Sequence, residues 1–353
     1  MKNSPISFIR QNDPECSVRF RKILFWGILF LLPVAAALLS LWFGSVSLSP
    51  SQVWAVLSDS LTAQTAPASL STAARIILYT RLPRTCAALL AGATLAVAGA
   101  VIQTVLHNPL ASPGIIGVNS SAGLAVALVC AIAPAAQKYT PFIAFGGALC
   151  GVLFVMLLSQ STGASRMTVV LAGVAISNLF SAGIDAVVTF VPDALNGVTD
   201  FRIGGFSGVT MRQLAPAATL IGISLLLLFS MTRQMDILAL GSDTAQSLGL
   251  SVKPIRILLL VLAAALAGAA VSFSGLLSFV GLIVPHIMRR FVGDESFPLL
   301  MTSALGGAFF VTLCDLLART LFSPFELPVG IVLAFMGAPF FLWLLFRQKG
   351  GRK

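Results

Sequence analysis

Ten apolar runs, each with at most one charged residue, dominate this sequence, and they constrain its fold more than any other feature. An α-helix rises 1.5 Å per residue, so about 20 apolar residues cross the hydrocarbon core of a bilayer. The first run covers residues 23–43, and the others cover residues 85–106, 122–136, 141–158, 168–188, 214–231, 255–271, 275–288, 299–317 and 329–346. We therefore predict an all-α integral membrane protein with about ten transmembrane helices, some of them short or broken.

Composition narrows the class further. Hydrophobic residues make up 57% of the 353 residues and charged residues only 10%, with a mean hydropathy of +0.97. Soluble domains carry about 25% charged residues, so an ordinary cytosolic enzyme is excluded. The net charge of +10 would suggest nucleic acid as the partner of a soluble protein. In a membrane protein it reflects the excess of Lys and Arg in cytoplasmic loops, and we predict no nucleic-acid partner.

Charge also divides the chain into segments. A basic tail occupies residues 1–22, one transmembrane domain occupies residues 23–346, and a second basic tail occupies residues 347–353. If both tails are cytoplasmic, ten crossings place most Lys and Arg residues inside, as the positive-inside rule requires. We predict a multi-pass plasma-membrane protein with both termini in the cytoplasm. Several arginines remain on the outer side, more than topology needs.

One pair of spans is too short. The 32 residues between Arg256 and Arg289 are uncharged, whereas two full spans need about 40. Residues 272–275, Ser-Phe-Ser-Gly, supply a break, and Pro285 interrupts the following helix. Broken helices within a membrane are typical of segments that line a protein-walled cavity. This pattern favours a transporter.

The sequence lacks the motifs that nucleotide-binding and metal-dependent enzymes use. No lysine follows a glycine, which excludes a phosphate-binding P-loop. The two histidines, His107 and His286, each lie beside a proline or a turn, and the five cysteines form no C-x-x-C pair. Neither arrangement is typical of a metal site. We predict a chain that is not an enzyme and that binds no cofactor or metal.

Two features could still carry function. Asp315 and Arg319 are four residues apart, the spacing of a helix ion pair. The loop 238–250 predicts a short helix: Gly241 precedes it, Asp243 can cap it, and Gly249 can end it. This helix could dock a partner or serve as a plain amphipathic connector, and these residues alone favour neither.

Six motifs occur in order along most of the chain. They are Arg81-Leu-Pro-Arg84 with Ala91-Gly-Ala93, His107-Asn-Pro-Leu-Ala111, Leu171-Ala-Gly-Val174, Leu240-Gly241 to Leu248-Gly-Leu250, Phe279-Val-Gly-Leu282 with Pro285-His286, and Asp315 to Arg319 with Glu326-Leu-Pro328. In this order the chain resembles the FecCD-type permeases of ABC importers, the membrane subunits that take up ferric siderophores, haem and vitamin B12.

The resemblance implies a type II ABC importer permease fold in a bacterial inner membrane. It also implies several partners: two cytoplasmic ATPase subunits that hold ATP and Mg, a second permease that is identical or related, and a soluble or lipid-anchored binding protein. By this resemblance we predict import of an iron chelate, most simply a ferric siderophore. Haem and cobalamin remain alternatives, and an ion-coupled secondary transporter remains a lower one.

The resemblance also assigns residues. ATPase coupling falls to Leu240, Gly241, Ser242, Asp243, Ala245, Leu248, Gly249 and Leu250. Docking of the binding protein falls to Arg81, Arg84 and Arg319, and Asp315 could orient the last of these. The cytoplasmic gate matches Asn108, Pro109 and Leu110, and more loosely residues 162–165. Polar uncharged residues that suit a translocation path are Gln103, Asn119, Ser120, Asn178 and Ser181.

Overall fold

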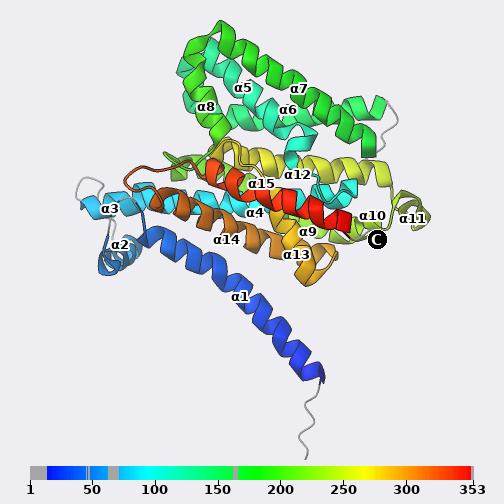
Figure 1. Ribbon diagram of the computed structural model, residues 1–353, viewed down its shortest axis with the longest axis horizontal. Coiled ribbons are helices and arrows are strands. Elements are labelled where there is room, and N and C mark those ends of the chain that lie inside the picture. Colours follow the sequence, from blue (N-terminus) through cyan, green and yellow to red (C-terminus); the bar gives the residue numbers. More distant parts are fainter. Residues whose placement is uncertain (1–13, 45, 47, 63–70, 162–165, 351–353) are drawn as a thin grey trace, which may run out of the picture.

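The computed structural model is a bundle of helices that run roughly along one direction (Figure 1). It describes residues 14–350 except 45, 47, 63–70 and 162–165. The predicted basic tails therefore lie partly outside the described residues, at 1–13 and 351–353. The first helix begins at Pro14, inside the segment predicted as a tail.

Each of the ten predicted spans corresponds to a helix. These helices are α1 (Pro14–Trp42), α4 (Leu82–Leu106), α5 (Val118–Ile132), α6 (Thr140–Ser161), α7 (Arg166–Phe190), α9 (Met211–Ser230), α12 (Val252–Ser274), α13 (Val280–Val292), α14 (Ser296–Thr320) and α15 (Val329–Gly350). Within the described residues, seven helical stretches are long and apolar enough to cross a membrane, and α5 and α15 form two shorter apolar helices. The prediction of an all-helical membrane protein is confirmed.

Shorter helices connect the spans, and the apolar pattern did not predict most of them. They are α2 (Pro50–Thr62), α3 (Thr72–Ile76), α8 (Leu195–Ile203), α10 (Thr232–Ala239) and α11 (Ser242–Ser247), with short 3₁₀ helices at Pro113–Ile116, Pro134–Tyr139 and Pro192–Ala194. A π-helical turn, Ile77–Arg81, joins α3 to α4. Leu82 separates this turn from Pro83, which has no backbone N–H to donate.

Helix α4 forms the centre of the bundle and is almost wholly buried. It packs against α12, α13 and α14, and two glycine pairs set the spacing of these contacts. A Cβ atom on Gly92 would overlap the carbonyl oxygen of Gly307 in α14, and one on Gly99 would overlap that of Gly281 in α13. Small residues at such crossings let helix backbones touch within a membrane.

The bundle has two ends, which we name after the short helices that mark them. The α11 end carries α10, α11 and the turn after α4; the α8 end carries α8, the start of α9 and the residues between α14 and α15. In Figure 1 the α8 end lies at the left and the α11 end at the right. The helices alternate in direction between these ends, so α1 starts and α15 finishes at the α11 end.

The predicted break between the seventh and eighth spans is present. Helix α12 stops at Ser274, Gly275 has φ 65°, and residues up to Phe279 are not helical. Backbone bonds from Leu276 N to Phe201 O, 2.9 Å, and from Gly205 N to Ser274 O, 2.8 Å, satisfy part of the exposed backbone. Helix α13 therefore covers only the α11 half of the bundle, and its start at Val280 corrects the predicted start at residue 275.

Candidate functional site

A short helix projects from the α11 end of the bundle (Figure 1). Helix α11 ends in a Schellman motif, in which Gly249 N and Leu250 N donate to Gln246 O and Ala245 O, both at 2.9 Å. Gly249 has φ 83°, the left-handed conformation that the motif requires. Gly249 thus ends the helix as predicted.

The start of α11 differs from the prediction. Gly241, with φ 107°, occupies the N-cap position, and no side chain caps the helix. Asp243 lies one position inside the first turn, so the expected Asp243 cap is wrong. Because a carboxylate in the first turn still faces the positive end of the helix dipole, Asp243 retains a favourable position.

Two exposed leucines flank α11. Leu240 is 62% exposed and Leu248 is 60% exposed, whereas Ala245 between them is fully buried against the bundle. Apolar side chains held in water by a capped helix are unfavourable unless a partner covers them. Leu240, Leu248 and the adjacent turn residues Gly241, Ser242 and Gly249 thus form a small apolar knob, which we call the α11 knob.

Three hydrogen bonds tie the α10–α11 segment to three different spans. His107 Nε2, just after α4, donates to Ala239 O at 3.1 Å. Arg256 of α12 donates to Ser242 Oγ at 3.0 Å. Asp236 accepts from the backbone N of Ser296, the first residue of α14, at 2.8 Å. A force applied at α11 therefore reaches α4, α12 and α14 together.

The three residues predicted as a gate directly follow this linkage. His107 adopts φ 50° as the C-cap of α4, which turns the chain sharply. Asn108 Oδ1 accepts from Leu110 N at 2.9 Å, and Asn108 N donates to Gln103 O at 3.1 Å. Asn108, Pro109 and Leu110 thus form a tight turn beside the end of α10. Residues 162–165, the looser match to the gate, lie outside the described residues.

Halfway along the bundle, a cavity of about 420 Å³ opens beside the α12–α13 break. Its polar lining consists of Ser112, Asn119, Ser177, Asn178 and Ser278, and no charged residue lines it. Its apolar lining includes Leu95, Val174, Phe279 and Leu282. The structure brings the two predicted asparagines together here, from α5 and α7.

The other three residues predicted for the path lie elsewhere. Gln103 is 2% exposed, and its Nε2 donates to Gly281 O at 3.1 Å, so it joins α4 to α13. Ser120 Oγ bonds back to Gly117 O at 3.2 Å, and Ser181 lies exposed on α7. Sequence reasoning missed Ser278, although its place within the predicted break could have indicated it.

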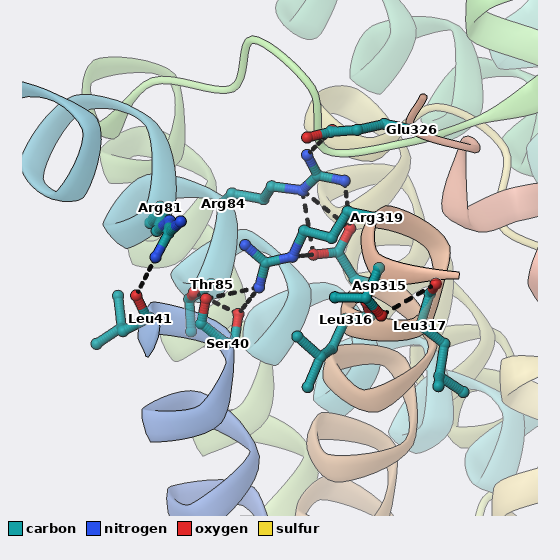
Figure 2. A network of polar contacts seen from close by, with 11 residues as sticks. Ser40, Leu41, Arg81, Arg84, Thr85, Asp315, Leu316, Leu317, Arg319 and Glu326 are labelled. Atoms are coloured by element: carbon teal, nitrogen blue, oxygen red, sulfur yellow. Dashed lines mark hydrogen bonds and ion pairs between the residues drawn. The ribbon is translucent and has the colours of Figure 1, made fainter. Parts of the chain in front are cut away.

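At the α8 end, charged side chains of α4, of α14 and of the segment between α14 and α15 form one network (Figure 2). Arg84 Nε of α4 lies 3.0 and 3.1 Å from the two carboxylate oxygens of Asp315 in α14, which is fully buried. Arg84 Nη1 also pairs with Glu326 at 2.5 Å. The predicted pair of Asp315 with Arg319 is confirmed, although at 3.6 Å it is the longer contact.

Two arginines of this region hold the end of α1. Arg319 donates to Ser40 O at 2.6 Å and to Ser40 Oγ at 2.5 Å. Arg81 donates to Leu41 O at 2.9 Å (Figure 2). It also donates to Trp42 O at 2.6 Å. The last carbonyls of a helix lack partners within the helix and carry its negative dipole end, so cations are favourable there.

Burial bears directly on the docking role predicted for these arginines. Arg81, Arg84 and Arg319 are 3%, 6% and 2% exposed, and their partners lie within the chain. Direct pairing with a soluble protein would need side chains that reach water. The structure instead gives the three arginines an internal role that the sequence indicated only for Arg319.

The sequence contains a signal that Asp315 and Glu326 need a further cation besides Arg319. Asp315 and Glu326 are the only acidic residues after Glu295. The buried carboxylate of Asp315 requires a cation, and Glu326 adds a second negative charge at the same end of the bundle, so the two need more than Arg319 alone. Arg84 supplies that charge from a distant part of the chain.

A second cavity, of about 620 Å³, opens beside this network at the α8 end. Arg84, Asp200 and Glu326 supply its charges, and the turn from Gly204 to Gly208 forms much of its wall. Asp185, in the span predicted at residues 168–188, pairs with Arg202 at 3.5 Å, and both side chains are exposed. Among the described residues, no three His, Cys, Asp or Glu side chains gather closely enough to hold a metal ion.

Comparison with known proteins places this geometry in context. The model of the FecCD transport family matches residues 31–347. The hemin transport system permease protein HmuU of Yersinia pestis is 35% identical over 341 residues, covering 95% of this chain and 98% of that protein. The Fe(3+) dicitrate transport system permease protein FecD of Escherichia coli K12 is 38% identical, covering 78% and 86%.

Solved structures agree with the fold. A protein described as an inward-facing metal-chelate type ABC transporter superposes with a TM-score of 0.78 at 31% identity, covering 93% of this chain and 99% of that one. PsaBC from Streptococcus pneumoniae, in complex with Fab, superposes with a TM-score of 0.53 at 20% identity, covering 72% and 88%. The second likeness bears on the fold alone.

Proposed function

This chain belongs to the FecCD transport family, and on that premise we propose that it is the permease subunit of an ABC importer that carries an iron chelate, most simply a ferric siderophore. The observation that carries the proposal is the α11 knob, with Leu240 and Leu248 exposed on either side of α11 at one end of the bundle. Such a surface suits a partner that pushes from that side.

The proposed partner at α11 is a cytoplasmic ATPase subunit, two per transporter, which binds ATP and Mg. The α11 end is then the cytoplasmic side, and both termini lie there. When the ATPases close, α11 would move and pull on the three hydrogen bonds to α4, α12 and α14. The turn Asn108–Leu110, next to His107, would shift with them and act as the gate.

The cavity beside Asn119 and Asn178 is the proposed translocation path. Its uncharged polar lining can contact a large chelate without holding it tightly. A second permease, identical or related, would close the other side of this path. Since this lining carries no charge to select a cargo, specificity would reside in the binding protein. Among the relatives, the names include hemin, Fe(3+) dicitrate and achromobactin, so haem remains an alternative cargo. Cobalamin remains an alternative only through the family resemblance of the sequence motifs.

The binding protein would dock at the α8 end. Because Arg81, Arg84 and Arg319 are buried, we propose that they support this surface from beneath and do not pair with the binding protein directly. The exposed edge of the network is Glu326, whose side chain is 32% exposed. This edge borders the cavity of about 620 Å³, which faces outward at this end.

An ion-coupled carrier fits less well. Such a carrier needs an ionisable group at mid-membrane. Among the described residues, Asp315 is paired at the α8 end and Asp185 is exposed beside Arg202. Neither lines the cavity at mid-bundle.

Uptake into proteoliposomes tests the proposal. The chain, reconstituted with its ATPase and binding protein, should import a radiolabelled ferric siderophore only when ATP is present on the side of the membrane that carries the ATPase. A proton ionophore should leave the rate unchanged. Uptake that needs no ATP and stops with the ionophore would establish a secondary transporter instead.

A further inference from the structure

A groove unrelated to the proposed path lies between α6 and α9, near the α8 end. Both helices pack on α12, and the space between them measures about 840 Å³. Its lining includes the small side chains of Ala217, Thr219 and Ala269, beside Pro216. Small residues at these positions leave unfilled the volume that larger side chains would occupy.

Two cations stand at the mouth of the groove. Lys138 lies between α5 and α6, and Arg212 lies in the first turn of α9, both exposed. The groove lining contains no carboxylate. Among the described residues neither cation has an ion pair, and the Lys138 ammonium lies 5.1 Å from the Tyr139 ring centroid. Two positive charges without an anion favour a negatively charged ligand.

Part of the groove lining is apolar and faces outward from the bundle. Phe142 is 61% exposed and Ile223 is 58% exposed, and both line it with Phe145 and Leu220. In a transmembrane bundle, outward apolar side chains contact acyl chains. Tyr139 and the cations lie at the helix ends, the depth at which aromatic and basic residues meet lipid headgroups. The groove therefore has a basic part at the depth of the lipid headgroups and an apolar part at the depth of the acyl chains.

We propose that this groove binds one anionic glycerophospholipid. Its phosphate lies between Lys138 and Arg212, and one acyl chain runs along Phe142, Phe145 and Leu220. The lipid fills the space between α6 and α9 and fixes both helices on α12. This site depends on the bilayer location of the chain and not on the identity of the cargo.

Lipid retention measures the site directly. The full-length protein is reconstituted in nanodiscs of phosphatidylglycerol and phosphatidylcholine, extracted in detergent, washed, and analysed for bound lipid by native mass spectrometry. Wild type should retain phosphatidylglycerol in preference to phosphatidylcholine. The double variant Lys138→Gln/Arg212→Gln should lose about tenfold or more of this retention, because one charge-assisted contact contributes about that factor. Arg202→Gln, exposed at the same end but outside the groove, should retain the wild-type amount.

A second variant keeps both cations and fills the part of the groove that would hold the acyl chain. Thr219→Trp places an indole in the groove and should abolish retention, while gel filtration and circular dichroism remain those of wild type. Equal retention by wild type and the double variant would overturn the proposal. Displacement of the lipid by millimolar inorganic phosphate would also overturn it, because the site would then select a free anion and not a lipid.

Discussion

Arg84 on α4 and Asp315 on α14 are 231 positions apart in the chain, yet the Arg84 Nε lies within 3.1 Å of both Asp315 carboxylate oxygens. Helices α4 and α14 also contact each other at Gly92 and Gly307. The Arg84–Asp315 ion pair therefore lies at one end of an interface in which the helix backbones touch at these two glycines. The same cluster extends through Arg319 to Ser40 at the end of α1. It fastens the first helix to the core.

Removing the shared carboxylate should therefore destabilise the bundle. Asp315→Asn leaves the buried Arg319 without its counter-charge and leaves Arg84 paired only with the partly exposed Glu326. Breaking a buried pair lowers stability by about 3–5 kcal/mol. We expect a clearly lower midpoint of thermal unfolding in detergent, followed by the exposure of buried cysteines to a thiol dye.

The matched control is Asp185→Asn, whose pair with Arg202 is exposed on both sides. Exposed pairs contribute about 0–1 kcal/mol, so its midpoint should stay near wild type. If both variants melt together, the Asp315 network has no structural role.

The glycines at which α4 contacts its neighbours should not be replaceable by a residue with a side chain. Gly99→Ala forces a methyl group against the Gly281 carbonyl, and overpacking of this kind costs about 1–3 kcal/mol or more. Gly146→Ala on α6 is the control, because nothing lies within 4 Å of its added Cβ. Yield of monodisperse protein and the unfolding midpoint should fall for the first variant only. Equal values for both would show that α4 and α13 can separate freely.

His107 should transmit motion from α11 to the gate. His107→Ala removes the bond to Ala239 O and should slow ATP-driven uptake about fivefold, the factor expected for one hydrogen bond. ATP hydrolysis should continue. His107→Gln can still donate to that carbonyl and should recover part of the uptake. If His107 mattered only for folding, His107→Ala would lower ATP hydrolysis and uptake by the same factor. His107→Gln would then also change both rates by the same factor.

Blocking the mid-bundle cavity should stop transport without affecting assembly. Asn178→Trp fills the space beside Asn119 and Ser278 and should reduce uptake to background, with ATPase binding unchanged. Leu153→Trp, on an exposed face of α6, should transport normally. Normal uptake by Asn178→Trp would place the path elsewhere.

Much of the fold follows from the sequence because a bilayer permits few solutions. Helices must satisfy their own backbone in lipid, so each apolar run predicted a span, and the deficit between Arg256 and Arg289 predicted the break after Ser274. The α11 helix was also predictable, since Gly241 and Gly249 are local signals for its ends.

Tertiary contacts were beyond the same reasoning. Gln103 looked like a path residue because it is polar within an apolar helix, but its partner, the Gly281 carbonyl, is 178 positions away. The burial of Arg81 depends on α1, whose last carbonyls it caps. Short polar helices such as α8 follow no apolar period and are stabilised by their neighbours.

The central claim is that the α11 knob seats an ATPase, and copurification tests it most directly. The tagged protein is isolated from its native membrane in mild detergent, and every accompanying chain is identified and quantified. Wild type should bring an ATPase subunit at equal stoichiometry, whereas Leu240→Asp/Leu248→Asp should lose it and Lys253→Gln, at the same end, should keep it. An ATPase that remains bound to the leucine double variant, or is absent from wild type, would contradict the account.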